Sequence, residues 1–275
     1  MVAILDVTSN FSFLRGASHP EELVQAAYDL GYSAIAVTDR NSLAGVVRAH
    51  KTAKQLGIRY VVGCRLDLTD GPSLLAYPKN REGYGNLCRL LSHGKLKAKK
   101  GECHISLDDV AAYSADIIFI ALLDDDPAAD TVACLKNALP APYYWGVYHR
   151  YQGDDSERFD SLQIALSAHG LSPVALGDVH YHEPNRRPLQ DVLTCIREGK
   201  RIDQAGYLLK ANAECHLKAP EEMERLFRSW PEAVANTHAL IADCTFSLDE
   251  LRYNYPQEPV PAGKSPQEHL EAITW

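Results

Sequence analysis

The chain has 275 residues, of which 46% are hydrophobic and 23% are charged, and its formal net charge is −8. This composition is typical of a folded globular protein, and the negative charge makes the chain as a whole a poor partner for a phosphate backbone. No apolar run approaches the roughly 20 residues of a membrane helix and the first residues do not resemble a signal peptide, so we expect a cytoplasmic protein without membrane contact.

Strand and helix signals alternate along the first 180 residues. Short apolar runs typical of buried strands lie at 4–7, 33–38, 60–62, 73–77, 116–121, 143–148 and 174–180. Caps, first-turn acids and terminal glycines predict helices between most of them, at about 18–30, 42–56, 80–91, 127–138 and 155–169. This alternation predicts an α/β fold with a parallel sheet, and six or seven such units favour a closed barrel.

The second part of the chain carries further helix signals. The segment 187–197 and two segments that begin at Pro220 and Pro231 predict extra C-terminal helices that cover the barrel. Residues 255–263 are rich in proline, and the segment from Ser265 to Glu268 predicts the capped start of another helix. We therefore expect a barrel domain with covering helices at 1–250, followed by a linker and the start of a further domain at 251–275.

Metal-capable side chains fall at the ends of the predicted strands. In barrels of this type, chemistry takes place at the carboxyl ends of the strands. Strand residues two apart point to one face, so Asp178 and His180 could bind one cation, although the pair also fits a hydrogen-bonded turn. The candidate ligands are Asp6, Asp39, His149, Asp178 and His180.

A basic segment follows the helix predicted at 80–91. It contains Lys95, Lys97, Lys99 and Lys100 and ends at Gly101. Four lysines in six residues could contact a phosphate chain, but the pattern also fits a solvated loop. Both interpretations remain open at this stage.

Three stretches carry a resemblance to a known family. They are TSNFSFLRGAS at 8–18, AVTDRNSLAG at 36–45 and GDVH at 177–180. Together they resemble the amino-terminal PHP (polymerase and histidinol phosphatase) domain of bacterial DNA polymerase III alpha subunits, in the error-prone, damage-inducible branch. The resemblance implies a distorted (βα)7-type TIM-like barrel, with the start of a polymerase palm after residue 250. It also implies damage-tolerant DNA synthesis by the parent chain, with Mg²⁺ bound only in that palm.

The resemblance also implies a metal centre, from which this chain departs. The family's barrel holds up to three divalent metals through His, Asp, Glu and sometimes Cys. Here Asp39, Asp178 and His180 match the pattern and His149 is assigned to a fourth place, but Asp6 stands in the opening His-x-His motif. A guanidinium group cannot bind a cation because it only donates hydrogen bonds and stays protonated. Arginine replaces ligands or their neighbours at Arg15, Arg40 and Arg65.

These departures suggest that ion pairs replace the metal cluster. Our hypothesis is that the three arginines form bidentate pairs with the three aspartates at the strand ends, namely Asp6, Asp39 and Asp178. No cofactor is then expected, and Arg40→His or Arg65→Glu alone should lower the melting temperature. The alternative is that the arginines point to solvent and the metal site is simply eroded.

Three functions follow from these interpretations. The first is a non-catalytic structural domain whose partners are the remaining polymerase domains and, through them, DNA. The second is a metal-dependent phosphoesterase or 3′–5′ exonuclease, with Zn²⁺ or Mn²⁺ held by the candidate His and Asp ligands. The third is a module that binds DNA, a sliding clamp or other proteins of a mutagenic complex through residues 95–100 and Arg186–Arg187.

Overall fold

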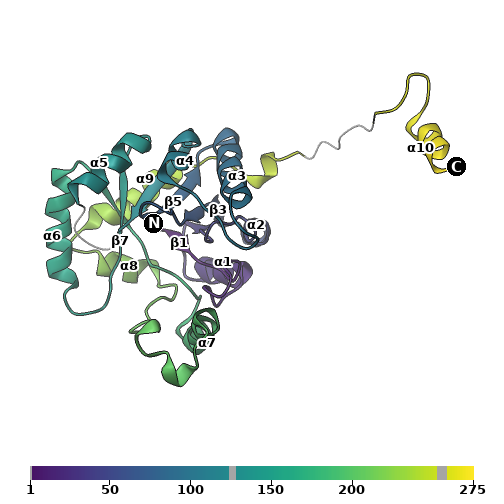
Figure 1. Cartoon of the computed structure of the whole chain (residues 1–275). Coiled ribbons are helices and arrows are strands. Elements are labelled where there is room, and N and C mark those ends of the chain that lie inside the picture. The colour runs from purple at the N-terminus through teal and green to yellow at the C-terminus, as the bar shows by residue number, and fades with distance from the viewer. Residues whose placement is uncertain (1, 124–127, 253–258) are drawn as a thin grey trace.

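A computed structural model describes residues 2–123, 128–252 and 259–275. Helices surround a central group of strands (Figure 1). The first sheet is parallel, in the order β1-β2-β3, with β1 (Ala3–Val7), β2 (Ala34–Val37) and β3 (Arg59–Val62). The second has the order β4-β5-β6-β7-β8, with β4 (Cys64–Leu66), β5 (Ser73–Pro78), β6 (Ile117–Leu122), β7 (Tyr144–Val147) and β8 (Ser172–Ala175).

The two sheets adjoin at two places. Only Gly63 separates β3 from β4, and a Cβ atom there would lie 2.7 Å from the Thr38 methyl group, so no side chain fits without movement. At the other seam, Thr8 N–H donates to the Val179 carbonyl (2.8 Å) and bridges the end of β1 to the segment after β8. The strands thus follow one another around a distorted TIM-like barrel, as the sequence predicts.

One strand runs against the predicted direction. β5 is antiparallel to both β4 and β6, so the prediction of an all-parallel sheet is wrong at this point. A loop at 67–72, which contains Gly71-Pro72, joins β4 to β5 without a helix, and a short connection can only reverse the chain. The three-residue strand β4 was not predicted.

The helices mostly lie where the caps predict them. Asn80 caps α3 by accepting a hydrogen bond from Gly83 N–H (3.0 Å), and Gly57 ends α2 in the left-handed region (φ 77°). The helices are α1 (Pro20–Asp29), α2 (Val46–Leu56), α3 (Arg81–Leu96), α4 (Leu107–Ala112), α5 (Ala129–Ala138), α6 (Asp155–Ala168), α7 (Arg187–Glu198), α8 (Pro220–Leu226), α9 (Pro231–Asp243) and α10 (Pro266–Thr274).

Two of these helices differ from the prediction. α3 continues to Leu96, so Lys95 belongs to its last turn and the basic loop begins later than expected. The short helix α4 was not predicted, although Ser106 forms a capping box with Asp109. The predicted start of α5 at residue 127 lies outside the described residues.

Both faces of the strands are buried. Ala3 and Leu5 of β1 belong to one apolar cluster, whereas Ile4 and Val7 belong to another that includes residues of the surrounding helices. Inside the barrel, the Tyr77 hydroxyl donates to the Leu5 carbonyl (2.5 Å) and ties β5 to β1. Burial on both sides explains why these strands are continuous apolar runs in the sequence.

Residues 266–274, which form the last described helix, contribute nothing to this core. α10 begins with the predicted capping box between Ser265 and Glu268, and it has no buried residue. Part of the predicted linker, at 253–258, lies outside the described residues, so the boundary at residue 250 stays a prediction. In the part of the chain that the structure describes, no helix has the length and apolar character needed to cross a bilayer.

Close packing of α3 on β6 gives a test of the fold. In Gly83→Ala, the new methyl carbon would lie 2.0 Å from the Asp116 carbonyl oxygen, and such overpacking should cost about 1–3 kcal/mol. Gly85→Ala is the matched control, because the nearest atom is the flexible Arg89 side chain at 3.6 Å and alanine favours a helix by about 1 kcal/mol. Urea unfolding should show Gly83→Ala destabilised and Gly85→Ala unchanged or more stable. Equal stability of the two variants would contradict this packing.

Candidate functional site

Asp6 lies in β1 and is held by the peptide backbone. Its two carboxylate oxygens accept hydrogen bonds from the N–H groups of Gly177 (2.9 Å) and Asp178 (2.6 Å). Burial raises the pKa of Asp6 to about 7, although these hydrogen bonds act in the opposite direction. Both oxygens therefore already have donors from the segment that follows β8.

Asp39 follows β2 and is buried, with 2% of its surface exposed. Its carboxylate accepts hydrogen bonds from Ser9 N–H (2.9 Å), the Ser9 hydroxyl (2.7 Å) and the Ser12 hydroxyl (2.7 Å). Burial raises the pKa of Asp39 against the effect of these donors. Gly16 permits the loop that carries the serines, because a Cβ atom there would lie 2.4 Å from the Ser9 carbonyl oxygen.

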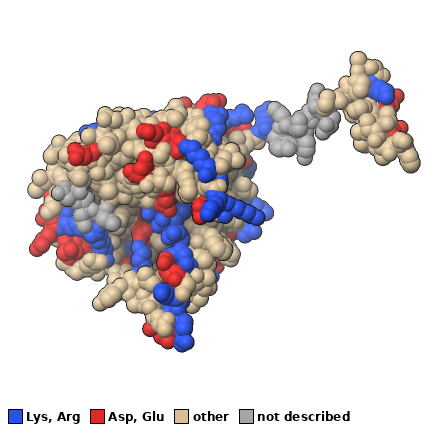
Figure 2. Space-filling view, in the orientation of Figure 1, with Lys and Arg blue, Asp and Glu red and all other residues tan. Residues whose placement is uncertain are grey.

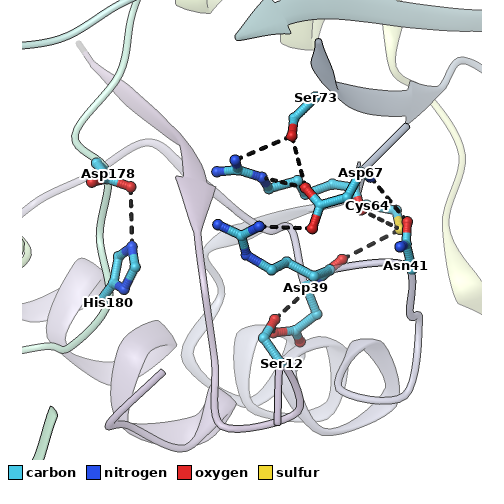
Figure 3. Close-up of polar contacts among 10 residues, drawn as sticks. Ser12, Asp39, Asn41, Cys64, Asp67, Ser73, Asp178 and His180 are labelled. Carbon is cyan, nitrogen blue, oxygen red and sulfur yellow. Dashed lines mark hydrogen bonds and ion pairs between the residues drawn. The ribbon is translucent and has the colours of Figure 1, made fainter. Parts of the chain in front are cut away.

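Asp178 and His180 contact each other, as their spacing predicts (Figure 3). His180 Nε2 lies 3.0 Å from one Asp178 oxygen, while Lys210 Nζ donates to the other oxygen at 2.7 Å. Burial alone would raise the pKa of Asp178, but the charges and hydrogen bonds of His180 and Lys210 hold it well below its ordinary value. The predicted strand does not reach this pair, because β8 ends at Ala175 and Asp178 has a positive φ of 46°.

Two of the three arginines converge on a carboxylate that the sequence did not single out. Arg40 donates to one oxygen of Asp67 (2.7 Å), and Arg65 Nε donates to the other (3.0 Å). Figure 3 shows dashed lines that meet at the labelled Asp67 side chain. The Ser73 hydroxyl adds a third donor at 2.7 Å. Burial alone would raise the pKa of Asp67, but Arg40, Ser73 and Arg65 outweigh it and lower that pKa.

The predicted pairing of arginines with the strand-end aspartates is therefore wrong in its partners. Arg40 and Arg65 neutralise Asp67, whereas Lys210 neutralises Asp178, which also contacts His180. Arg15 forms no ion pair with any residue in the described ranges. Burial and the neighbouring charge of Arg40 lower the pKa of Arg15, so this guanidinium group lies in a positive environment.

His149 follows β7, and its side chain contacts residues of α6 and α8. Its Nε2 atom lies 2.7 Å from the Leu226 carbonyl oxygen, and its Nδ1 atom lies 3.3 Å from Asp155 in α6. The ring packs edge-on against Phe159 and Phe227. Both ring nitrogens thus have partners other than the candidate ligands, and the residue ties α6 to α8.

The carboxylates at these strand ends are engaged by donors of the chain itself. Peptide groups donate to Asp6, a peptide group and hydroxyl groups donate to Asp39, and the ammonium group of Lys210 donates to Asp178. Within residues 2–123, 128–252 and 259–275, no three His, Cys, Asp or Glu side chains form a group that could hold a metal ion. The arrangement holds its carboxylates with protein donors instead.

Sequence reasoning missed Asp67 and Lys210. Asp67 could have been found, because it lies two residues beyond Arg65 at the end of β4 and so shares its face of the strand. Lys210 gave no such signal, since it lies in an irregular segment between α7 and α8, 32 residues from the aspartate that it contacts.

The fold and these positions define a class of protein. Residues 5–161 match the PHP domain family, and the chain belongs to that family. Among solved structures, the chain resembles an amidohydrolase from Chromobacterium violaceum that was determined with bound sulfate and no metal. That likeness has a TM-score of 0.50 and 14% identity, and it covers 66% of this chain and 88% of the other. It therefore concerns the fold alone.

Curated relatives place the chain more narrowly. It is 47% identical to an error-prone DNA polymerase of Caulobacter vibrioides over 99% of this chain and 26% of the relative. It is 45% identical to error-prone DNA polymerase 1 of Agrobacterium fabrum, over 99% of this chain and 25% of the relative. The chain is thus similar to PHP domains of error-prone DNA polymerases and spans about a quarter of the length of these relatives.

Removal of Asp67 should destabilise the domain. Asp67→Ala would leave Arg40 and Arg65, each about one-fifth exposed, without their carboxylate, at a cost of about 2–4 kcal/mol. Asp249→Ala removes a carboxylate from an exposed pair with Lys54 and should leave the stability nearly unchanged, because solvent screens such a pair. Thermal melts of the two variants against the parent measure the difference. A melting temperature of Asp67→Ala equal to that of the parent would rule out this role.

The raised pKa of Asp6 predicts a pH dependence of stability. Folding favours the protonated carboxyl group, since its ordinary pKa is 3.8 and its folded value is about 7. The resulting stabilisation is complete below the ordinary value and is lost as the pH rises through about 7. Urea unfolding should therefore show a decline with pH in this window that Asp6→Asn lacks. Identical slopes for parent and variant would show that Asp6 does not titrate as described.

Proposed function

We propose that this chain is a non-catalytic, structural PHP domain of an error-prone DNA polymerase. Its partners would be the remaining domains of the polymerase and, through them, DNA, in synthesis across damaged templates. Two findings support this proposal: membership of the PHP family, and similarity along almost the whole chain to error-prone polymerases about four times its length.

The contact between Lys210 and Asp178 carries the non-catalytic part of the proposal. An ammonium group 2.7 Å from a carboxylate oxygen takes the place where a metal would receive its lone pair. The charge of Asp178 is one of the causes that raise the pKa of the neighbouring Asp6. The ammonium group of Lys210 supplies positive charge that offsets the repulsion between these two acidic groups. The Lys210 ammonium group thus supplies positive charge, as a metal ion would, but it is not a Lewis acid and does not activate a water molecule.

A phosphoesterase or exonuclease would need a different arrangement of the same residues. Hydrolysis of this type requires a metal with an open coordination position, or a pair of metals that stabilise the attacking and leaving oxygens. Asp39 is turned toward Ser9 and Ser12, and an ion would have to share a carboxylate that already accepts three hydrogen bonds. The structural role keeps these contacts as they are.

Metal content and turnover test this proposal together. After incubation with Zn²⁺ or Mn²⁺ and removal of the free ion, elemental analysis should find no stoichiometric metal, and a nitrophenyl phosphodiester should not be hydrolysed. Lys210→Met should lower the melting temperature, because Asp178 loses its cation, and chelator should not change the melting temperature of the parent. One equivalent of metal that is lost in Asp178→Ala, together with turnover, would overturn the non-catalytic assignment.

A further inference from the structure

A cleft opens beside the Asp67 ion pairs. Its volume is about 550 Å³, and it lies between the loop after β1, the residues after β2 and the segment that ends α3. Figure 2 shows Lys and Arg side chains gathered on the face between α3 and α7. The residues of this basic cleft that matter here are Phe13, Arg15, Arg40, Lys95, Lys99 and Lys100.

The charge of the basic cleft is not balanced by its own residues. Five Lys and Arg side chains line it, against the two carboxylates of Asp67 and Glu102. Asp67 already forms ion pairs with Arg40 and Arg65, and a carboxylate oxygen of Glu102 lies 3.4 Å from His104 Nε2. This local excess contrasts with the net charge of −8 for the whole chain, so the cleft is where an anion is attracted.

Several of the cations have no acidic partner. Arg15, Lys95, Lys99 and Lys100 form no ion pair with other described residues, and the three lysines are exposed. A group with several anionic oxygens would satisfy these donors, and a phosphate chain offers such oxygens at regular spacing.

An aromatic side chain stands at the same cleft. Phe13 is 82% exposed, which is unusual for a phenylalanine and leaves its ring face free in this structure. An exposed ring beside unpaired cations is the combination by which proteins bind single strands: the cations follow the backbone and the ring stacks on a base. A duplex keeps its bases stacked inside and would not use the ring.

We propose that the basic cleft binds a single-stranded polynucleotide, with Arg15, Lys95, Lys99 and Lys100 at the phosphates and Phe13 stacked on a base. The site would let the domain hold a single strand without hydrolysing it. The inference is independent of the proposed polymerase role, since it rests on the cleft alone. The inference also does not depend on whether the domain binds a metal, because binding of a single strand needs no metal.

Fluorescence anisotropy with a labelled oligothymidylate tests the proposal on the 275-residue chain. Binding should weaken with salt, and the triple variant R15A/K99A/K100A should reduce the slope of log K against log salt by about 2. Phe13→Ala should weaken binding roughly tenfold, and Phe13→Trp should restore it. Lys97→Ala is the matched control, since Lys97 lies in the same segment but pairs with Asp109 (2.8 Å) outside the cleft. It should bind like the parent.

Further ligands distinguish binding of a single strand from binding of other anions by the same cleft. An oligouridylate that binds as well as the oligothymidylate supports the proposal, because no contact in the cleft selects the sugar. Tighter binding of a duplex, or competition by inorganic polyphosphate together with full affinity of Phe13→Ala, would reduce the cleft to a general anion site and overturn the proposal. Absence of binding at low salt, or an equal loss in Lys97→Ala and the triple variant, would overturn it as well.

Discussion

The neutralisation of carboxylates at one end of the barrel is the constraint on which the site depends. Asp6 lies near the end of β1, and Asp39, Asp67 and Asp178 lie just beyond the ends of other strands. Burying a carboxylate without a partner costs several kcal/mol, on the order of the free energy of folding of a whole domain. Each of the four has therefore acquired donors from the chain itself.

The four carboxylates are satisfied in different ways, and this has structural consequences. Asp6 is held by peptide N–H groups and so fixes the segment after β8 against β1. Asp39 holds the loop after β1 through Ser9 and Ser12. Asp67 and Asp178 are the two that take full positive charges, from two arginines and from a lysine. The result is an end of the barrel that is cross-linked by side chains, which suits a structural domain.

Positive charge at this end of the barrel is not fully balanced by the carboxylates there. Arg15 has no carboxylate partner among the described residues, and together with the lysines of the basic cleft it gives this end of the barrel a local excess of positive charge. The two proposals rest on different residues: the structural role rests on the contact of Lys210 with Asp178, and the binding of a single strand rests on the basic cleft.

Much of the fold is predictable from the sequence because local signals coincide with the tertiary structure. Gly57 and Asn80 mark helix ends, and continuous apolar runs mark strands that are buried on both faces. The strand β5 was predicted, but its antiparallel direction was not, because that direction depends on a helix-free loop rather than on the residues of the strand. The contact of Asp178 with His180 was predictable from spacing, but the partner Lys210 was not, since an irregular segment brings it from far along the chain. The partner of Arg40 and Arg65 was wrongly predicted, although Asp67 lies two residues beyond Arg65 and its spacing could have indicated the pairing.

Anomalous diffraction from crystals soaked in manganese chloride would locate a metal and the side chains around it in one experiment. We expect no manganese peak among Asp6, Asp39 and Asp178, and Lys210 Nζ should still contact the Asp178 carboxylate. A peak bound by Asp39, Asp178 and His180, with Lys210 displaced, would contradict this expectation.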